Sequence, residues 1–104
     1  MSTIKQTQQS QTASKVLDVL EVLMGHFAHG LTPTELSKAT GLEPSAITRY
    51  VATLEASGFA ERIPETGRIR PSVRLAQQAV SILRSVEAAR TRLDELSNRL
   101  NTSR

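Results

Sequence analysis

The segment from Thr32 to Ala52 contains two helix start signals separated by a glycine turn, and this spacing constrains the fold more than any other feature. Thr32-Pro33-Thr34-Glu35 has the pattern of a capping box, with proline at the first helical position and glutamate reaching back to the capping threonine. Gly41 follows and can adopt the left-handed conformation that a tight turn between helices requires. A second helix then starts at Glu43-Pro44. The segment therefore predicts two short helices joined by a tight turn.

The second helix has one apolar stripe, because Ile47, Tyr50, Val51 and Leu54 recur at helical spacing. The residues off this stripe are Ser45, Ala46, Thr48, Arg49, Ala52 and Thr53. Gly58 is expected to end the helix, and two strand-like runs, 59–63 and 68–70, flank the hairpin-loop sequence Glu65-Thr66-Gly67. The predicted fold is mainly α with a small β-hairpin, a winged helix-turn-helix followed by a long C-terminal helix. This plan places one helix in the major groove of DNA and a basic loop against the DNA backbone.

Residues 14 to about 80 resemble the N-terminal DNA-binding domain of the isocitrate-lyase-regulator (IclR) family of bacterial transcription factors. The resemblance implies that Ser45, Thr48 and Arg49 lie on the recognition helix and that Arg68 lies at the wing, which is the β-hairpin. The matching segments are Leu31-Thr32-Pro33-Thr34-Glu35-Leu36, Thr40-Gly41-Leu42, Ser45 to Glu55, and Gly58 to Arg68.

Two features depart from the family pattern. Family members often have proline and then a basic residue where this chain has Glu43-Pro44, so one phosphate contact is expected to be missing. The family also carries a large C-terminal effector-binding domain, for which a chain of 104 residues has no room. No small-molecule ligand is therefore expected.

The composition excludes several other classes of protein. The net charge of +3 and the pI of about 10.0 permit nucleic-acid binding without requiring it. The chain has no cysteine, so it has no disulfide framework, and a reducing cytoplasm, on the nucleoid, is the expected location. No apolar run approaches a membrane span.

His26 and His29 are three residues apart but have no third ligand nearby, so neither a metal site nor a cofactor is expected. No nucleophile with a base is present, and the chain is not expected to be an enzyme.

The chain is expected to divide into three parts. Residues 1–13 are polar and without period, which predicts a disordered tail; the alternative, an arm that reaches DNA, has only Lys5 to support it. Residues 14–71 form the winged helix-turn-helix domain, whose first helix is expected to start at Ser14. The residues expected to face inward are Leu17, Leu20, Leu23, Met24 and Phe27 in the first helix and Leu36 and Ala39 in the next.

Residues 72–104 predict a long helix with an unbroken heptad seam. We interpret it as a dimerisation coiled coil, and the alternative is a helix that folds back on its own domain. Among the residues that flank the seam, a parallel pair would place Ser85 of one copy beside Arg90 of the other, and Arg92 beside Ser97. No like charges would then face each other, which weakly favours parallel pairing. The seam residues are Leu75, Ala79, Ile82, Val86, Ala89, Leu93, Leu96 and Leu100.

The candidate DNA contacts differ in kind. Arg49 is equally suited to a base edge and to a phosphate. Ser45 and Thr48 can reach either, although Ser45 could instead satisfy the first turn of its helix. The wing arginines are expected to follow the backbone or the minor groove, and the alternative is a solvated basic hairpin. The wing arginines are Arg62, Arg68 and Arg70, and the remaining candidates are Thr34, Lys38 and Thr53.

The sequence thus predicts a homodimeric transcriptional regulator whose partners are double-stranded DNA and a second copy of itself. Two recognition helices would read an inverted-repeat operator, and the bound dimer would repress by occluding a promoter. The small size would suit a phage or prophage. Two alternatives remain: a DNA-binding accessory protein for replication, transposition or segregation, and a winged helix that binds another protein.

Overall fold

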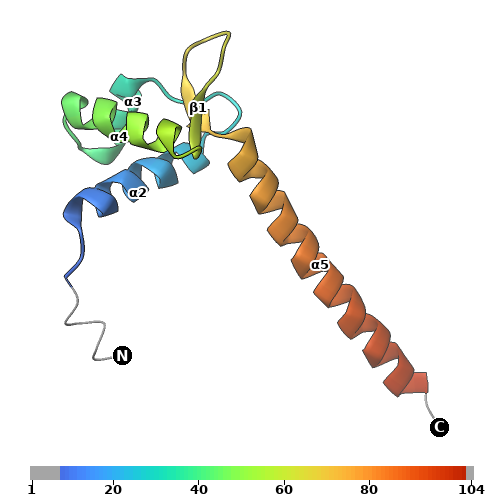
Figure 1. The fold of residues 1–104 in the computed structure, drawn as a ribbon. Helices are drawn as coiled ribbons and strands as arrows, with labels where there is room; N and C mark the ends of the chain where they lie inside the picture. Colours follow the sequence, from blue (N-terminus) through green and yellow to red (C-terminus); the bar gives the residue numbers. More distant parts are fainter. Residues whose placement is uncertain (1–7, 103–104) are drawn as a thin grey trace. The chain divides into compact units, whose positions relative to one another are not determined.

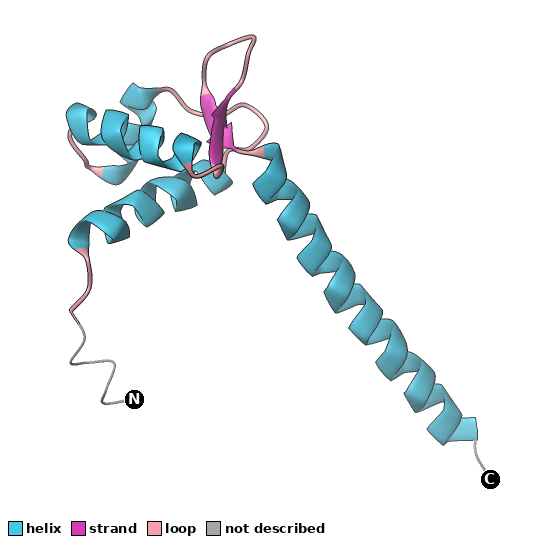
Figure 2. Cartoon of the chain, viewed as in Figure 1, coloured by secondary structure: helices cyan, strands magenta, loops and turns pink. Residues whose placement is uncertain are grey.

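The computed structural model describes residues 8–102 and confirms a winged helix-turn-helix followed by a long helix (Figure 1). The chain divides into two compact units, the first ending at Ser72 and the second beginning at Val73. Three helices and a two-stranded hairpin make up the first unit, whereas the second is a single helix (Figure 2). The elements are α2 (Gln11–Met24), α3 (Pro33–Thr40), α4 (Pro44–Ala56), β1 (Ala60–Arg62), β2 (Ile69–Pro71) and α5 (Val73–Thr102).

One hydrophobic core holds the first unit together, and every helix and strand of that unit contributes to it. The predicted stripe of α4 is confirmed, because all four of its residues are buried. Leu36 of α3 is completely buried, as predicted, whereas Ala39 is exposed. The core residues are Val19, Leu23, Leu31, Leu36, Ile47, Tyr50, Val51, Leu54, Ala60 and Ile69.

The start of α3 and the turn between α3 and α4 both have the hydrogen bonds that the sequence predicted. The Thr32 side chain accepts from the Glu35 amide at 3.1 Å, and the Glu35 carboxylate accepts from the Thr32 amide at 2.9 Å, which completes the capping box. Gly41 has a φ of 74° and donates its amide hydrogen to the Ser37 carbonyl at 2.8 Å. The turn is therefore formed by residues adjacent in sequence, which explains why local patterns predicted it.

The wing is an antiparallel hairpin that is joined to the chain segment before α3. Glu61 pairs with Arg70 across the hairpin; the first strand is shorter than predicted, and the second has the predicted length but begins one residue later. Leu31 and Ile69 form an additional antiparallel bridge, in which each amide donates to the other's carbonyl at 2.8 and 2.9 Å. This bridge fixes the base of the wing beside the start of the helix-turn-helix.

Helix α2 begins earlier than the sequence predicted. Its N-cap is Ser10, whose hydroxyl accepts from the Ala13 amide at 3.1 Å, and Ser14 lies inside the helix. The predicted start at Ser14 is therefore wrong, because both serines satisfy the preference for a cap and only the upstream one is used. The proposed DNA-reaching arm with Lys5 lies outside the described residues.

The inward face of α2 also differs from the prediction. Leu23 is completely buried, but Leu17 and Met24 are 62% and 55% exposed and Phe27 is 38% exposed. The face that packs against the core contains Val16, Val19, Leu20 and Leu23, which recur at the helical spacing of 3, 1 and 3. The prediction chose the large side chains of Leu17 and Met24 in place of the valines, so the predicted face is rotated around the helix axis relative to the observed one.

Helix α5 spans 30 residues without a break, and none of them is buried. Six of its eight seam residues are exposed within this chain, with Ile82, Leu93 and Leu100 each about two-thirds exposed, whereas Leu75 and Ala89 are partly buried. Across residues 8–102, no helix combines the length and the apolar composition that a membrane-spanning segment needs.

Two glycines with similar backbone angles provide a matched stability test. Gly30 has a φ of +70°, and a Cβ there would lie 2.6 Å from the Ile69 carbonyl oxygen, whereas Gly41 has a φ of +74° and open space around it. We expect Gly41→Ala to lower the free energy of unfolding by about 1–2 kcal/mol through backbone strain alone. Gly30→Ala should cost about 3 kcal/mol, because the Ile69 carbonyl that accepts from Leu31 must also move. Urea unfolding measures both, and equal losses would contradict the close approach.

Candidate nucleic-acid interface

One face of α4 is exposed along its length and lies opposite the buried stripe. Ser45, Thr48, Arg49 and Ala52 recur at the spacing of 3, 1 and 3, and all four are exposed. Apart from Arg49, these side chains are short, so the helix backbone can approach the floor of a DNA groove closely. The structure thus brings together the recognition-helix residues that the sequence selected.

Both threonine hydroxyl groups on α4 are held by the helix itself. Thr48 donates to the Pro44 carbonyl at 3.2 Å, and Thr53 donates to the Arg49 carbonyl at 3.1 Å. Each hydroxyl oxygen still has lone pairs that can accept a hydrogen bond from a base amino group. Both side chains are thus oriented in the free protein.

Arg49 extends from the same face, over an aromatic ring. Its guanidinium carbon lies 5.5 Å from the centroid of Tyr50, whose side chain is anchored in the core with 7% exposed. A cation above a ring face is attracted to it, and this contact leaves the guanidinium N–H groups able to donate. Arg49 is therefore oriented in the free protein by its contact with the Tyr50 ring.

The remaining helical candidates lie around the start of α4 and on α3. Glu43 is the N-cap of α4 and makes no side-chain cap hydrogen bond, and Pro44 begins the helix. Thr34 and Lys38 are exposed and four residues apart on α3, which places them on one side of that helix.

Each wing arginine forms an ion pair within the protein. Arg70 binds Glu61, its cross-strand neighbour, at 2.8 Å, and its guanidinium carbon lies 5.3 Å from the Phe27 ring centroid. The Arg62 Nε lies 3.5 Å from a Glu55 carboxylate oxygen of α4. The Arg70 side chain is 22% exposed and the Arg62 side chain is 50% exposed, so the sequence-based alternative of a solvated basic hairpin fits Arg62 better than Arg70.

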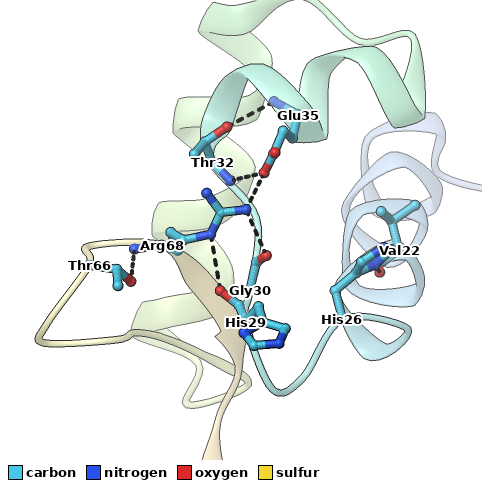
Figure 3. A network of polar contacts seen from close by, with 8 residues as sticks. All are labelled: Val22, His26, His29, Gly30, Thr32, Glu35, Thr66 and Arg68. Atoms are coloured by element: carbon cyan, nitrogen blue, oxygen red, sulfur yellow. Dashed lines mark hydrogen bonds and ion pairs between the residues drawn. The ribbon is translucent and has the colours of Figure 1, made fainter.

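Arg68 turns toward the start of α3 (Figure 3). One terminal nitrogen donates to the Glu35 carboxylate at 2.7 Å and to the Gly30 carbonyl at 3.3 Å, and its Nε donates to the His29 carbonyl at 3.1 Å. The predicted contact of Arg68 with DNA stays a prediction, but in the free protein its donors point at the protein's own oxygens.

These pairs change the charge that the first unit presents to DNA. Between residues 8 and 72 there are six lysines and arginines and seven aspartates and glutamates. Three of the six cations form ion pairs, which leaves Lys15, Lys38 and Arg49 without one in that range. The positive charge available to phosphates on this unit is therefore small and includes Lys38 and Arg49 of the candidate interface.

Sequence reasoning missed two features of this region. Glu35 was identified only as part of a cap, because its partner Arg68 is 33 residues away and no local pattern links them. The start of α2 was placed too late, so the open groove of about 600 Å³ between that start and α4 was not foreseen. The groove is lined by Ser10, Thr12, Ala13, Val16, Leu17, Arg49, Tyr50 and Thr53.

Neither histidine contributes to a metal-binding cluster in the structure. The His26 Nδ1 lies 3.1 Å from the Val22 carbonyl oxygen of the preceding helical turn. Within residues 8–102, no three histidine, cysteine, aspartate or glutamate side chains gather closely enough to hold a metal ion.

Comparison with known proteins identifies the same segment. The model of the IclR helix-turn-helix domain matches residues 12–64. The HTH-type transcriptional regulator XynR of Escherichia coli K12 is 29% identical over 92 residues, which cover 86% of this chain and 36% of that protein. The crystal structure of HmgR from Pseudomonas aeruginosa superposes with a TM-score of 0.63 and 25% identity over 88% of this chain and 39% of that one.

An IclR family transcriptional regulator from Brucella abortus has the same fold, with a TM-score of 0.58 and 20% identity over 73% of this chain and 28% of that one. The chain thus spans between about a quarter and two-fifths of the length of the relatives it matches.

The Glu35 carboxylate provides a pH test of the capping box and its arginine. The Thr32 amide that donates to it, together with Arg68, holds the pKa of Glu35 below its ordinary value. A carboxyl group with a lowered folded-state pKa stabilises the fold above its unfolded pKa of about 4.3 and loses this contribution as pH falls. We expect the urea midpoint to fall between pH 5 and pH 3, with a smaller fall in Glu35→Gln. An equal fall in both proteins would contradict this role.

Proposed function

The chain belongs to the IclR helix-turn-helix family, and on this basis we propose that it is a transcriptional regulator that binds specific double-stranded DNA through α4. The observation that carries the proposal is the exposed face of Ser45, Thr48, Arg49 and Ala52, opposite a fully buried stripe. Its short side chains and one oriented arginine fit a helix that enters the major groove.

We infer that the regulator acts as a homodimer joined through α5. Eight apolar residues continue through this helix in an unbroken heptad pattern, and those beyond Val80 remain largely exposed within the chain. A polar helix of this length with one apolar seam gains stability mainly by packing that seam against another helix. A second copy supplies an identical seam of about 38 Å, counted from Leu75 to Leu100 at 1.5 Å per residue.

The residues beside the seam favour parallel pairing. In a parallel pair, Ser85 lies beside Arg90 of the second copy and Arg92 lies beside Ser97, so no like charges meet directly. In an antiparallel pair, the flanking arginines of the two copies could approach each other, so the charge pattern weakly favours parallel pairing. A parallel pair also carries both winged units at the same end of the coiled coil.

A two-fold symmetric pair of recognition helices reads two half-sites related by inversion and separated by about one helical turn of DNA. We propose that the dimer binds such an inverted repeat in the cytoplasm and represses transcription by occluding the promoter. Binding at two half-sites combines the contact energies, which offsets the small number of cations on each winged unit.

A second candidate function, a winged helix that binds another protein, is favoured by one observation. The winged unit carries slightly more acidic than basic residues between positions 8 and 72, which is unusual for a surface that binds a polyanion. Salt distinguishes the two functions, because binding driven by phosphate contacts weakens steeply with salt. If only Lys38 and Arg49 of each protomer contact phosphates, the slope of log K against log salt should be about −4.

Arg49 is the first side chain to test. The operator is first identified by sequencing the genomic DNA fragments that the protein retains. We then expect Arg49→Ala to weaken the affinity of the protein for this operator by about 10–100-fold per half-site contact, since one oriented guanidinium contact is worth about 1–3 kcal/mol. Lys15→Ala is the matched control, because it removes the same charge from α2, outside the candidate interface. Equal losses in both variants would mean that only the net charge matters.

If α5 joins two copies, a charged substitution in the seam should halve the mass of the protein in solution. We expect light scattering to give twice the 11.4 kDa of one chain for the wild type and the monomer mass for Leu93→Glu, because a buried carboxylate in the seam lacks a partner. Thr91→Glu introduces the same charge on the opposite side of α5 and should remain dimeric. A monomeric wild type at tens of micromolar would refute the coiled coil.

A further inference from the structure

We propose that Arg68 is a positioning residue that locks the wing to the start of the helix-turn-helix, and that its guanidinium stays in this place when DNA binds. The consequence for DNA affinity rests on the proposed function, whereas the lock itself is a property of the free protein. This assignment differs from the sequence-based expectation that Arg68 contacts the DNA backbone or the minor groove.

The donors of Arg68 converge on one short segment. The guanidinium binds two successive backbone carbonyls, those of His29 and Gly30, and the Glu35 carboxylate, so three acceptors from residues 29–35 engage one planar group (Figure 3). Because three acceptors already hold the guanidinium in one orientation, the Arg68 side chain has little conformational freedom left in the free protein. Moving this side chain to a phosphate would leave the Glu35 carboxylate without its cation.

A single oxygen atom connects the lock to the capping box. Glu35 Oε1 accepts from the Thr32 amide at 2.9 Å and from Arg68 at 2.7 Å. The same carboxylate therefore caps α3 and holds the wing. The side chains of Arg68 and Glu35 are 32% and 47% exposed, so the pair is only partly solvated.

The position of Arg68 in the chain explains why the lock is needed. Arg68 directly precedes Ile69, whose backbone pairs with Leu31, and it follows the tight loop closed by the Gly67 amide and the Ile63 carbonyl at 2.7 Å. The Leu31 bridge holds Ile69 of β2, while the side chain of Arg68 holds the residue at which the loop ends, directly before β2. The angle of the wing relative to α3 and α4 therefore depends on both contacts.

The test uses two glutamates whose replacement changes the charge equally. Glu35→Gln keeps an amide oxygen for the cap but removes the ion pair, whereas Glu65→Gln changes an exposed side chain of the wing loop. Simple electrostatics predicts that both variants bind DNA more tightly, because each removes a negative charge. The lock predicts the opposite sign for Glu35→Gln.

In the free protein, hydrogen exchange of the Leu31 and Ile69 amides should be about tenfold faster in Glu35→Gln and unchanged in Glu65→Gln, with Leu23 as an internal reference in the core. On the operator, Glu35→Gln should bind about 5–10-fold more weakly and Glu65→Gln no more weakly than the wild type. Unchanged exchange in Glu35→Gln would overturn the proposal even if DNA binding is never observed.

Variants of Arg68 decide whether the guanidinium touches DNA. Arg68→Lys keeps the charge and loses the fork, and the lock predicts faster exchange at Leu31 and Ile69 with the salt slope of DNA binding unchanged. A phosphate contact instead predicts wild-type exchange, together with a slope that falls by about 1 per protomer in Arg68→Gln. In a protein that already carries Glu35→Gln, adding Arg68→Lys should accelerate exchange by less than half as much as Arg68→Lys does in the wild type. Equal acceleration in both backgrounds would show that the two side chains act separately.

Discussion

The backbone pairing of Leu31 with Ile69 is the contact on which the arrangement of the winged unit depends. It joins the segment before α3 to the second strand of the wing, across 38 residues of chain, and both side chains are buried in the core. Gly30 makes this approach possible, because any side chain there would meet the Ile69 carbonyl. The hydrogen bonds of Arg68 extend the same junction outward toward the loop. The relation between wing and recognition helix is therefore set by contacts between distant parts of the chain.

This distinction between near and distant contacts explains which features the sequence could predict. The capping box, the left-handed Gly41 and the stripe of α4 are formed by neighbours within four or seven residues, so local patterns were sufficient. The inward face of α2 depends on which side of the helix meets α3, α4 and β2, and it was predicted incorrectly for Leu17 and Met24. The partners of the wing arginines could not be predicted, since Arg68 and Glu35 are brought together only by the fold.

The ion pairs of the wing affect how a protein of this kind would discriminate among DNA sequences. Arginines held by Glu35, Glu55 and Glu61 add little to the general attraction toward phosphates. Affinity for random DNA comes mainly from such general attraction, whereas specific affinity also needs contacts with base edges. A winged unit with few unpaired cations therefore depends more on shape and base contacts, and spends less time bound to unrelated sequences.

The exposed face of α4 has a further consequence for how this regulator could diverge. Ser45, Thr48, Arg49 and Ala52 contribute nothing to the hydrophobic core, which is built from the opposite side of the helix. Under the proposed function, substitutions at these four positions change the DNA sequence that is read without weakening the fold. The same scaffold can thus acquire new targets by a few mutations, and gene duplication would give regulators that fold alike and control different promoters.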